Sequence, residues 1–418
     1  MESQELLSVF DARERLLSGV DVLDSETVKT ESALGRVLAE DILASDNIPP
    51  FASSSMDGYA VRAIEVAAAA AESGVVLPVT ADIPAGFGIP QALSEGSAAR
   101  IMTGAPLPAG ADAVVPIEMT DDPGGSAETQ APQSVSVLSS VESGDYVRLA
   151  GQDMRCGQQV LTGGDLLRPQ EIGVLAAVGR SRVRVVRQPR VSILSTGDEL
   201  VEVGASLGPG QIRDANSFIL SSLVRRYGGV PSVLGIARDR TEDVETILDR
   251  ALESGTDWLL SSGGVSVGAF DCVKTVVERY GELKFWRVNM RPGKPLAFGN
   301  YRGTPFLGMP GNPVSAMVSF EVFARPALKK LCGRRNLDKP SIQVMVKDEF
   351  TSDGRESYLR VLIRREKDEF VAHNVGSQDS GILTSLVRAN ALLIVPAGET
   401  HVAAGRRMTA WMLDWVQD

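Results

Sequence analysis

Residues 189–331 alternate between short apolar runs, which are typical of buried strands, and amphipathic runs, which are typical of helices. The predicted strands are 190–194, 230–236 and 258–261, and the predicted helices are 217–227, 242–252, 271–280 and 314–331. Such alternation favours a parallel sheet that is covered by helices and binds its ligands at the carboxyl ends of its strands. This pattern restricts the fold of the chain more than any other feature.

Three segments rich in glycine and proline, at 261–268, 291–295 and 308–313, suit a phosphate group. Glycine lets the backbone N–H groups approach an oxyanion closely, and a helix that follows adds its positive end. The candidate binding residues are Gly263, Gly264, Ser266, Gly268, Pro310, Gly311, Asn312 and Pro313, with Asn312 expected to cap the helix at 314–331. Any one segment could simply supply the turn residues of an α/β fold, but all three together favour one anion pocket.

Acidic and hydroxyl side chains follow the same predicted strands. The hydroxyls are Ser195 and Thr196, the acids are Glu199, Asp239 and Asp271, and the cations expected opposite them are Arg287, Arg291 and Lys294. Each acid alone could merely cap a helix or close a turn. Together the three carboxylates are hard oxygen ligands that suit Mg²⁺, and the set suits a metal-assisted reaction at a phosphoanhydride.

The rest of the chain shows other textures. Helices are predicted at 3–18 and 32–38, a β-rich region at 75–178, and a small barrel or sandwich after residue 333. The formal net charge of -11 disfavours polynucleotides, and three scattered cysteines argue against a disulfide framework. With only two histidines, histidine-based catalysis is not expected. Without a signal peptide or a long apolar run, we expect a soluble cytoplasmic protein.

Two further stretches, SSMDGYAVR at 54–62 and RIMTGAPLPAGADAVVP at 100–116, name no chemistry on physical grounds. They nevertheless closely resemble the molybdopterin molybdenumtransferase family, of the MoeA and gephyrin E-domain type. STGDEL at 195–200, SSGGVSVGAFDCVK at 261–274, RPGKPLAFG at 291–299, GMPGNPVSA at 308–316 and the segment 376–398 follow in the order that the family shows. The resemblance covers nearly the whole chain, and the ordered set is very specific.

The resemblance implies an elongated, multidomain α/β plus β subunit that forms a homodimer. The expected parts are an elongated N-terminal domain (1–53 with 147–180), an inserted β-rich domain (54–146), a MogA-like α/β molybdopterin-binding domain (181–333) and a C-terminal β-barrel (334–418).

The resemblance also implies an activity, in which molybdate enters adenylylated molybdopterin with Mg²⁺ and AMP is released. Carried over by position, Glu199, Asp239 and Asp271 resemble the pocket acids, and Arg287, Arg291 and Lys294 its cations. Asp57, Thr103 and, less closely, Asp153 resemble residues that reach the pocket from the other subunit, and Arg360 and Ser380 match positions in the barrel. Arginines stand at 287 and 291 where the family usually has lysines, which keeps the charge but not its compact shape.

Two other functions stay open at this point. The central domain also resembles molybdopterin adenylyltransferase, although the additional domains argue against that activity. A molybdopterin carrier or scaffold is the third interpretation, which the retained acids disfavour. The family implies that molybdopterin adenylyltransferase acts upstream and that molybdoenzymes or their chaperones receive the product.

Overall fold

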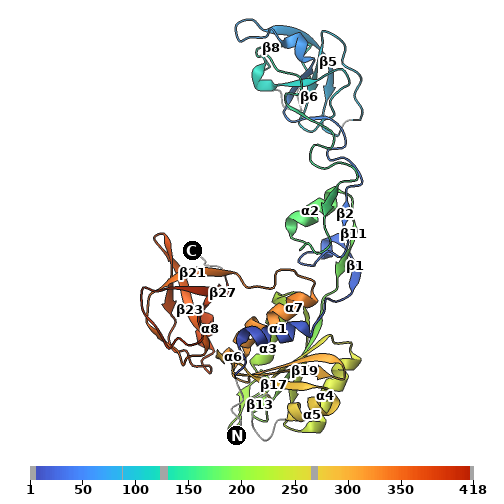
Figure 1. Cartoon of the computed structure of the whole chain (residues 1–418). Coiled ribbons are helices and arrows are strands. Elements are labelled where there is room, and N and C mark those ends of the chain that lie inside the picture. The colour runs from blue at the N-terminus through green and yellow to red at the C-terminus, as the bar shows by residue number, and fades with distance from the viewer. Residues whose placement is uncertain (1–5, 87, 123–129, 265–271, 415–418) are drawn as a thin grey trace.

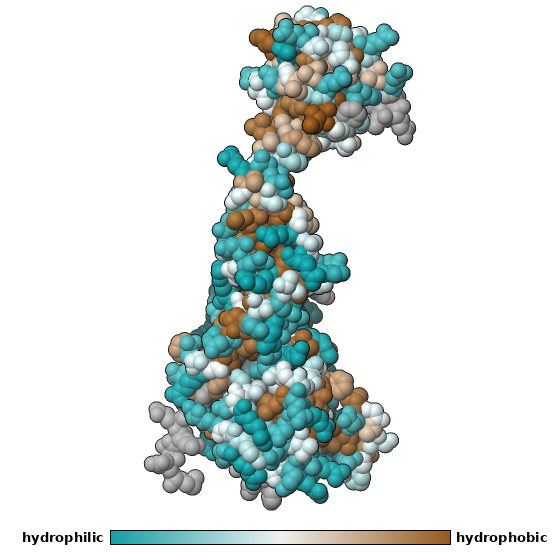
Figure 2. Space-filling view, turned by 90° about the vertical axis from the view of Figure 1, so that its right-hand side faces the viewer, coloured by the Kyte–Doolittle hydropathy of each residue, from teal (hydrophilic) through white to brown (hydrophobic). Residues whose placement is uncertain are grey.

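The structure is a computed structural model that describes residues 6–86, 88–122, 130–264 and 272–414. The chain forms an elongated molecule with a small β domain at one end and an α/β domain and a β-barrel at the other, joined by a narrow stalk (Figure 1). The side view in Figure 2 shows how strongly the molecule narrows between the β domain and the stalk. The expected multidomain fold is confirmed, while the exact domain boundaries stay a prediction.

The α/β domain contains a sheet of six described strands in the order β15-β12-β16-β20-β19-β17. They are β15 Val230–Ala237, β12 Arg190–Thr196, β16 Trp258–Ser262, β20 Thr304–Met309, β19 Pro295–Tyr301 and β17 Leu283–Arg287. The first four are parallel, as predicted, but β19 and β17 add antiparallel pairs. The sheet is therefore mixed, because Arg302 and Gly303, both with positive φ, close a two-residue hairpin between β19 and β20.

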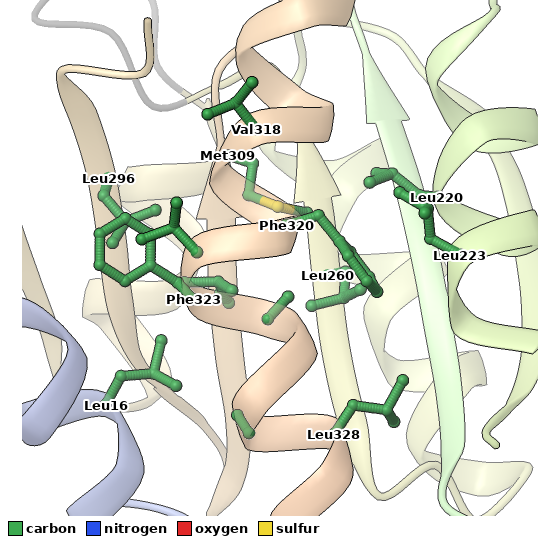
Figure 3. Packing of buried hydrophobic residues seen from close by; sticks show 14 of the residues in the cluster. Leu16, Leu220, Leu223, Leu260, Leu296, Met309, Val318, Phe320, Phe323 and Leu328 are labelled. Carbon is green, nitrogen blue, oxygen red and sulfur yellow. The ribbon is translucent and has the colours of Figure 1, made fainter. Parts of the chain in front are cut away.

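Helices cover both faces of this sheet. They are α1 Val9–Ser18, α3 Asn216–Arg226, α4 Thr241–Glu253, α5 Cys272–Tyr280, α6 Pro313–Ser319, a π-helical turn at Phe320–Ala324, and α7 Arg325–Leu331. Side chains alternate along the strands, so Ile193 and Leu260 join one core while Leu194 and Leu259 join the other. Figure 3 shows the first core, where α1, α3 and the α6–α7 helix pack together.

The stalk is built from segments on both sides of the inserted β domain. β1 Ser25–Lys29 pairs with β11 Arg182–Val186, β2 Ile42–Leu43 pairs with β10 Gln159–Leu161, and α2 Pro169–Ala177 packs beside them. The helix predicted at 32–38 is wrong: a short 3₁₀ helix, Thr30–Ser32, is followed by Gly35 at φ 76°. Val37 and Leu38 then form β-bridges with Leu166 and Val185, which a helix could not form, and both side chains are buried.

The β domain at the far end confirms the predicted β-rich second domain. Its described strands run in the order β7 Ala113–Pro116, β4 Gly58–Val61, β6 Ala98–Ile101, β5 Val75–Ile83 and β8 Ser134–Val137. The strand β4 lies between β6 and β7, which brings together the two stretches 54–62 and 100–116.

The C-terminal part is a closed barrel rather than a sandwich. Its strands run β18 Met290–Arg291, β23 Glu356–Glu366, β24 Glu369–Asn374, β21 Ser341–Val346, β27 Arg407–Met412 and β25 Ala391–Val395, and a β23–β25 pairing closes the ring. The smaller elements are β3 Ser53–Ser54, β9 Val147–Arg148, β13 Leu200–Val201, β14 Ile212–Arg213, β22 Phe350–Thr351, β26 His401–Val402, α8 Thr384–Arg388 and the 3₁₀ helices Ala63–Val66 and Ile117–Met119. In the described residues, no helix combines the length and apolar character that crossing a membrane requires.

Candidate functional site

A cavity of about 620 Å³ lies at the carboxyl ends of the four parallel strands. Each strand contributes through the loop that follows it: Thr196 ends β12, Asp239 follows β15, Gly263 follows β16 and Pro310 follows β20. The predicted residues in the lining are Thr196, Glu199, Asp239, Gly263, Gly264, Pro310, Gly311, Asn312 and Pro313. The cavity thus lies at the edge of the sheet that the sequence argument from strand ends predicted.

The two glycine loops approach each other across the cavity. Gly263 and Gly264 have φ of +87° and +67°, a region that residues with a Cβ rarely adopt. A Cβ on Gly263 would also lie 2.9 Å from the backbone oxygen of Thr196, and one on Gly311 would lie 3.8 Å from the Cα of Gly263. A side chain at Gly263 would therefore collide with the backbone at the end of β12 and displace the loop.

Asn216 braces these loops and was missed in the sequence. Its Nδ2 donates to Ser262 Oγ and to the backbone oxygen of Gly311, both at 2.6 Å, so one amide ties the β16 loop to the β20 loop. Its Oδ1 is buried and has no hydrogen-bond partner among the described residues. A sequence signal for this position was available, because Asp214 and Asn216 come immediately before an apolar helix pattern. In the structure, Asp214 Oδ1 accepts the N–H of Ser217 at the start of that helix.

Carboxylates gather at the β12 and β15 side of the cavity. Burial and the nearby charges of Asp198 and Glu199 raise the pKa of Asp239 above its usual range. The backbone N–H of Asp239 donates to Asp198 Oδ1 at 3.3 Å. Carboxylate oxygens are the ligand type that Mg²⁺ prefers, but no three Asp, Glu, His or Cys side chains of the described residues are arranged to hold a metal ion. Asp271, the third predicted ligand, lies outside the described residues, as do Ser266 and Gly268.

The predicted cations lie beside the cavity rather than in its lining. Lys294 and Arg287 are exposed, Lys294 precedes the lining residue Pro295, and Arg287 stands opposite Pro295 in the antiparallel β17–β19 register. Arg291 belongs to β18, which pairs with the barrel strand β23. The expectation that these cations face the acids inside one pocket is therefore not met. The cation that does line the cavity within the described part of the chain is Arg213, another residue that the sequence argument missed.

The barrel reaches the cavity through Ser380. Asn312 occupies the predicted N-cap position of α6 but forms no capping hydrogen bond; its Nδ2 donates instead to Ser380 Oγ at 3.1 Å. Arg360 is 1% exposed and donates to the backbone oxygens of Ser377 and Asp379, so it holds the loop that carries Ser380. Burial and the nearby Arg291 lower the pKa of Arg360 to about 10. Arg360 is thus a positioning residue here.

Ser195 is fully buried and does not line the cavity. The sequence suggested that the strand ended at residue 194, but β12 continues to Thr196. Alternation along the two additional residues directs Ser195 into the sheet packing, and its Oγ has no hydrogen-bond partner in the described part of the chain.

Asp57 and Thr103 form a second, separate constellation in the far β domain. Asp57 Oδ1 accepts the backbone N–H of Thr103 at 2.7 Å and the Thr103 hydroxyl at 2.8 Å. These hydrogen bonds hold the pKa of Asp57 below its usual range. Both residues are exposed, and their domain lies at the opposite end of the molecule from the cavity (Figure 1).

Asp153 lies with neither constellation. It is exposed near the junction of the stalk and the β domain, where its backbone N–H donates to the backbone oxygen of Ile48 at 3.0 Å.

Comparison with known proteins assigns three consecutive regions of the chain. Residues 7–179 match the MoeA N-terminal region (domain I and II), residues 192–330 a probable molybdopterin binding domain, and residues 343–413 the MoeA C-terminal region (domain IV). A molybdopterin molybdenumtransferase 2 of Mycobacterium tuberculosis is 38% identical over 394 residues, covering 93% of this chain and 95% of the relative. A molybdopterin molybdenumtransferase of Bacillus subtilis is 34% identical, covering 93% of this chain and 90% of the relative.

A solved structure has the same fold over the full length. The molybdopterin biosynthesis MoeA protein from Pyrococcus horikosii superposes with a TM-score of 0.80 at 30% identity, covering 99% of this chain and all of that one. Sequence, family models and fold therefore agree over the α/β domain, the stalk, the far β domain and the barrel. The chain belongs to the molybdopterin molybdenumtransferase (MoeA) family.

Proposed function

We propose that the protein is a molybdopterin molybdenumtransferase, which inserts molybdate into adenylylated molybdopterin while the pyrophosphate bond is cleaved and AMP leaves. The observation that carries this proposal is the placement of Glu199, Asp239 and two glycine loops around one cavity in a chain of this family. A dinucleotide-like pterin substrate needs a site for a pyrophosphate and a site for the metal that neutralises it.

In this proposal the glycine loops bind phosphate oxygens through backbone N–H groups, and the amide of Asn216 keeps the loops at a fixed separation. Glu199 and Asp239, together with Asp271, would hold Mg²⁺, which supplies charge neutralisation at the pyrophosphate. Lys294, Arg287 and Arg291 stand outside the acid cluster, where they suit the anionic ends of the substrates. No side chain needs to act as a nucleophile, so positioning and charge carry the rate.

The same proposal makes the working form a homodimer. Asp57 and Thr103 cannot share a site with the cavity of their own chain at the far end of the molecule, so a second copy must bring its β domain to that cavity. The edge of the sheet supports such pairing: no described strand pairs on the outer side of β15, and Val233 and Phe218 near that edge are 49% and 57% exposed. Unpaired strands with exposed apolar side chains are typical of an interface.

The proposal extends to the domain boundaries, the cellular location and the enzymes that act before and after this protein. The chain divides into domains at about residues 54, 146, 181 and 334. The protein works in the cytoplasm. It receives its substrate from molybdopterin adenylyltransferase. The finished cofactor then passes to molybdoenzymes or their chaperones.

The direct test is release of AMP from adenylylated molybdopterin with Mg²⁺, measured with and without low molybdate. We expect release that depends on molybdate. Tight binding of the pterin with no release under either condition would contradict the proposal and favour a carrier, and consumption of ATP with molybdopterin would favour an adenylyltransferase.

A further inference from the structure

A second cavity, of about 230 Å³, lies at the junction between the α/β domain and the barrel. Its lining comes from the end of α3, from α7, from the connection that leads into the barrel and from the end of β27. The charged residues in the lining are Arg226, Arg325, Lys329, Arg334, Lys339, Asp338 and Asp414. Neither the active-site proposal nor the family motifs use any of these residues.

The carboxylates at this junction already have partners. Asp338 pairs with Arg13 at 2.6 Å, Asp414 pairs with Arg226 at 2.7 Å, and the buried Glu321 pairs with Lys339 at 2.6 Å. Glu321 also lies 3.4 Å from Arg325 and shares its charge between the two cations. Lys329 and Arg334 therefore form no ion pair in the described part of the chain, and Arg325 shares Glu321 with Lys339.

Arg325 is the least expected member of this group, because it is 2% exposed. Its Nε donates to the backbone oxygen of Glu321 and its Nη1 to that of Leu337, but its Nη2 is buried and has no partner in the described ranges. A buried guanidinium with an unsatisfied donor is costly, and Arg325 also lines the cavity. Arg334 Nε is unsatisfied in the same way.

Burial and the neighbouring cations disfavour the charged form of Lys329. Burial, followed by the charges of Arg325 and Arg334, lowers the pKa of Lys329 to about 8. An anion in the cavity would favour the charged ammonium and reverse this shift. The cavity is also small, and the chain as a whole is negative, so neither a large ligand nor a polynucleotide fits.

We propose that this cavity binds a small tetrahedral oxyanion of the sulfate, phosphate or molybdate class, held by Arg325, Lys329 and Arg334. Guanidinium and ammonium donors that converge on one cavity are the usual receptor for such ions, and here they come from α7 and the segment directly after it. Because Met412 at the end of the barrel strand β27 also lines the cavity, the anion would sit between the α/β domain and the domain that carries Ser380. Its binding stabilises this junction by mass action.

The test is equilibrium dialysis of the intact protein with radioactive sulfate, which keeps its double negative charge near neutral pH. The informative variant is Lys329→Gln, because this side chain is only partly buried and makes no ion pair in the described residues. Lys347→Gln, an exposed lysine at the end of β21, makes the same change of charge away from the cavity. Lys294→Gln reports on sulfate bound beside the proposed active site.

We expect a saturable class of sulfate sites that Lys329→Gln weakens about tenfold and that Lys347→Gln leaves intact. Sulfate that Lys294→Gln alone displaces is assigned to the proposed active site and not to this cavity. Unlabelled phosphate and molybdate should compete, whereas chloride at matched ionic strength should not. Arg334→Gln should weaken binding in the same direction as a second, independent variant. Equal binding by Lys329→Gln, loss in Lys294→Gln alone, or equal displacement by chloride would each overturn the proposal.

The pH dependence gives a further readout. The charged and titratable groups that face Lys329 are Arg226, Tyr227, Arg325, Arg334, Asp338, Lys339 and Asp414. Burial lowers the pKa of Lys339 as well, but its ammonium is bound to Glu321 rather than free for the anion. Sulfate affinity should therefore fall as the pH rises through about 8 in the unmodified protein, and this fall should be absent in Lys329→Gln. A fall of the same size in the variant would contradict the role of Lys329.

Discussion

Asp239 and Asp57 are carboxylates at opposite ends of the molecule, and their surroundings shift their pKa values in opposite directions. Burial and the charges of Asp198 and Glu199 raise the pKa of Asp239, whereas hydrogen bonds from Thr103 lower that of Asp57. The first carboxylate lies among like charges and is suited to a cation that arrives with substrate. The second is satisfied within its own domain and is held in a fixed, ionised form. The comparison indicates that the cavity with Asp239 is suited to bind a cation with substrate. Asp57, by contrast, is already held in its ionised form by its own domain before any partner contacts it.

The largest effect is expected from the acids that line the cavity, Asp239 and Glu199, compared with their neighbour Asp198. Asp239→Asn and Glu199→Gln should each reduce molybdate-dependent AMP release at least about 100-fold, because even groups that only support metal ligands cost 10- to 100-fold. Asp198→Asn is the matched control, since Asp198 contacts Asp239 but does not line the cavity. Equal losses in Asp198→Asn and Asp239→Asn would remove the special role of the lining acids.

The next effect concerns the far β domain. Thr103→Val removes the hydroxyl that donates to Asp57 and should lower AMP release about tenfold, as expected for a hydrogen bond to a charged group. The backbone N–H of Thr103, the larger cause of the lowered pKa of Asp57, remains in Thr103→Val, so the pKa of Asp57 should rise part of the way and the acid limb of the pH profile should move to higher pH. Thr103→Ser keeps the hydroxyl and serves as the control. An unchanged profile in Thr103→Val would show that the ionised form of Asp57 is not required.

Two glycines with left-handed backbones, one in each region, allow the effect of a side chain on stability to be compared. Gly263 and Gly104 have similar φ values of +87° and +82°, but a Cβ on Gly104 would meet nothing within 4 Å. Gly104→Ala should therefore cost about 1 kcal/mol of stability from the left-handed backbone alone. Gly263→Ala adds a contact with the backbone oxygen of Thr196 and should cost about 2 kcal/mol or more.

Urea unfolding of the two variants, followed beside AMP release, measures this difference. Only Gly263→Ala should also reduce activity, because it alone displaces a loop that lines the cavity. Similar stability losses together with similar activity would mean that the β16 loop tolerates displacement.

The smallest effect is on stability against pH. The raised pKa of Asp239 means that its charged form destabilises the native state once the pH exceeds that pKa, so Asp239→Asn should raise the melting temperature at pH 7 and not at about pH 3. Asp57 has a lowered pKa, so its contribution is present at pH 7 and is lost as the pH falls; Asp57→Asn should lower the melting temperature at pH 7. Each shift should stay within about 2 °C. Calorimetry at the two pH values checks both signs, and shifts of the same sign would contradict the comparison.

The sequence predicted the edge of the sheet where the cavity lies, because alternating strands and helices place strand ends together. The sequence prediction was wrong about residues whose positions depend on contacts with distant parts of the chain. Asn312 was expected to cap its own helix, but a serine 68 residues away binds its amide. Ser195 was expected in the site because the end of β12 could not be located to within two residues. The cations near 290 were expected in the lining, but the antiparallel hairpin at Arg302 and the pairing of β18 with the barrel place them beside it.

The most direct test of a site completed by two copies is complementation between Asp57→Asn and Asp239→Asn. The two variants, carrying different affinity tags, would be co-expressed and the mixed dimer purified. The mixed dimer has one cavity with both residues intact, so it should recover about half of the wild-type AMP release, although each variant alone is nearly inactive. A mixed dimer of Asp239→Asn with Glu199→Gln is the control and should stay inactive, because both changes lie in the same cavity lining. Failure of the first mixed dimer to recover activity would contradict the account.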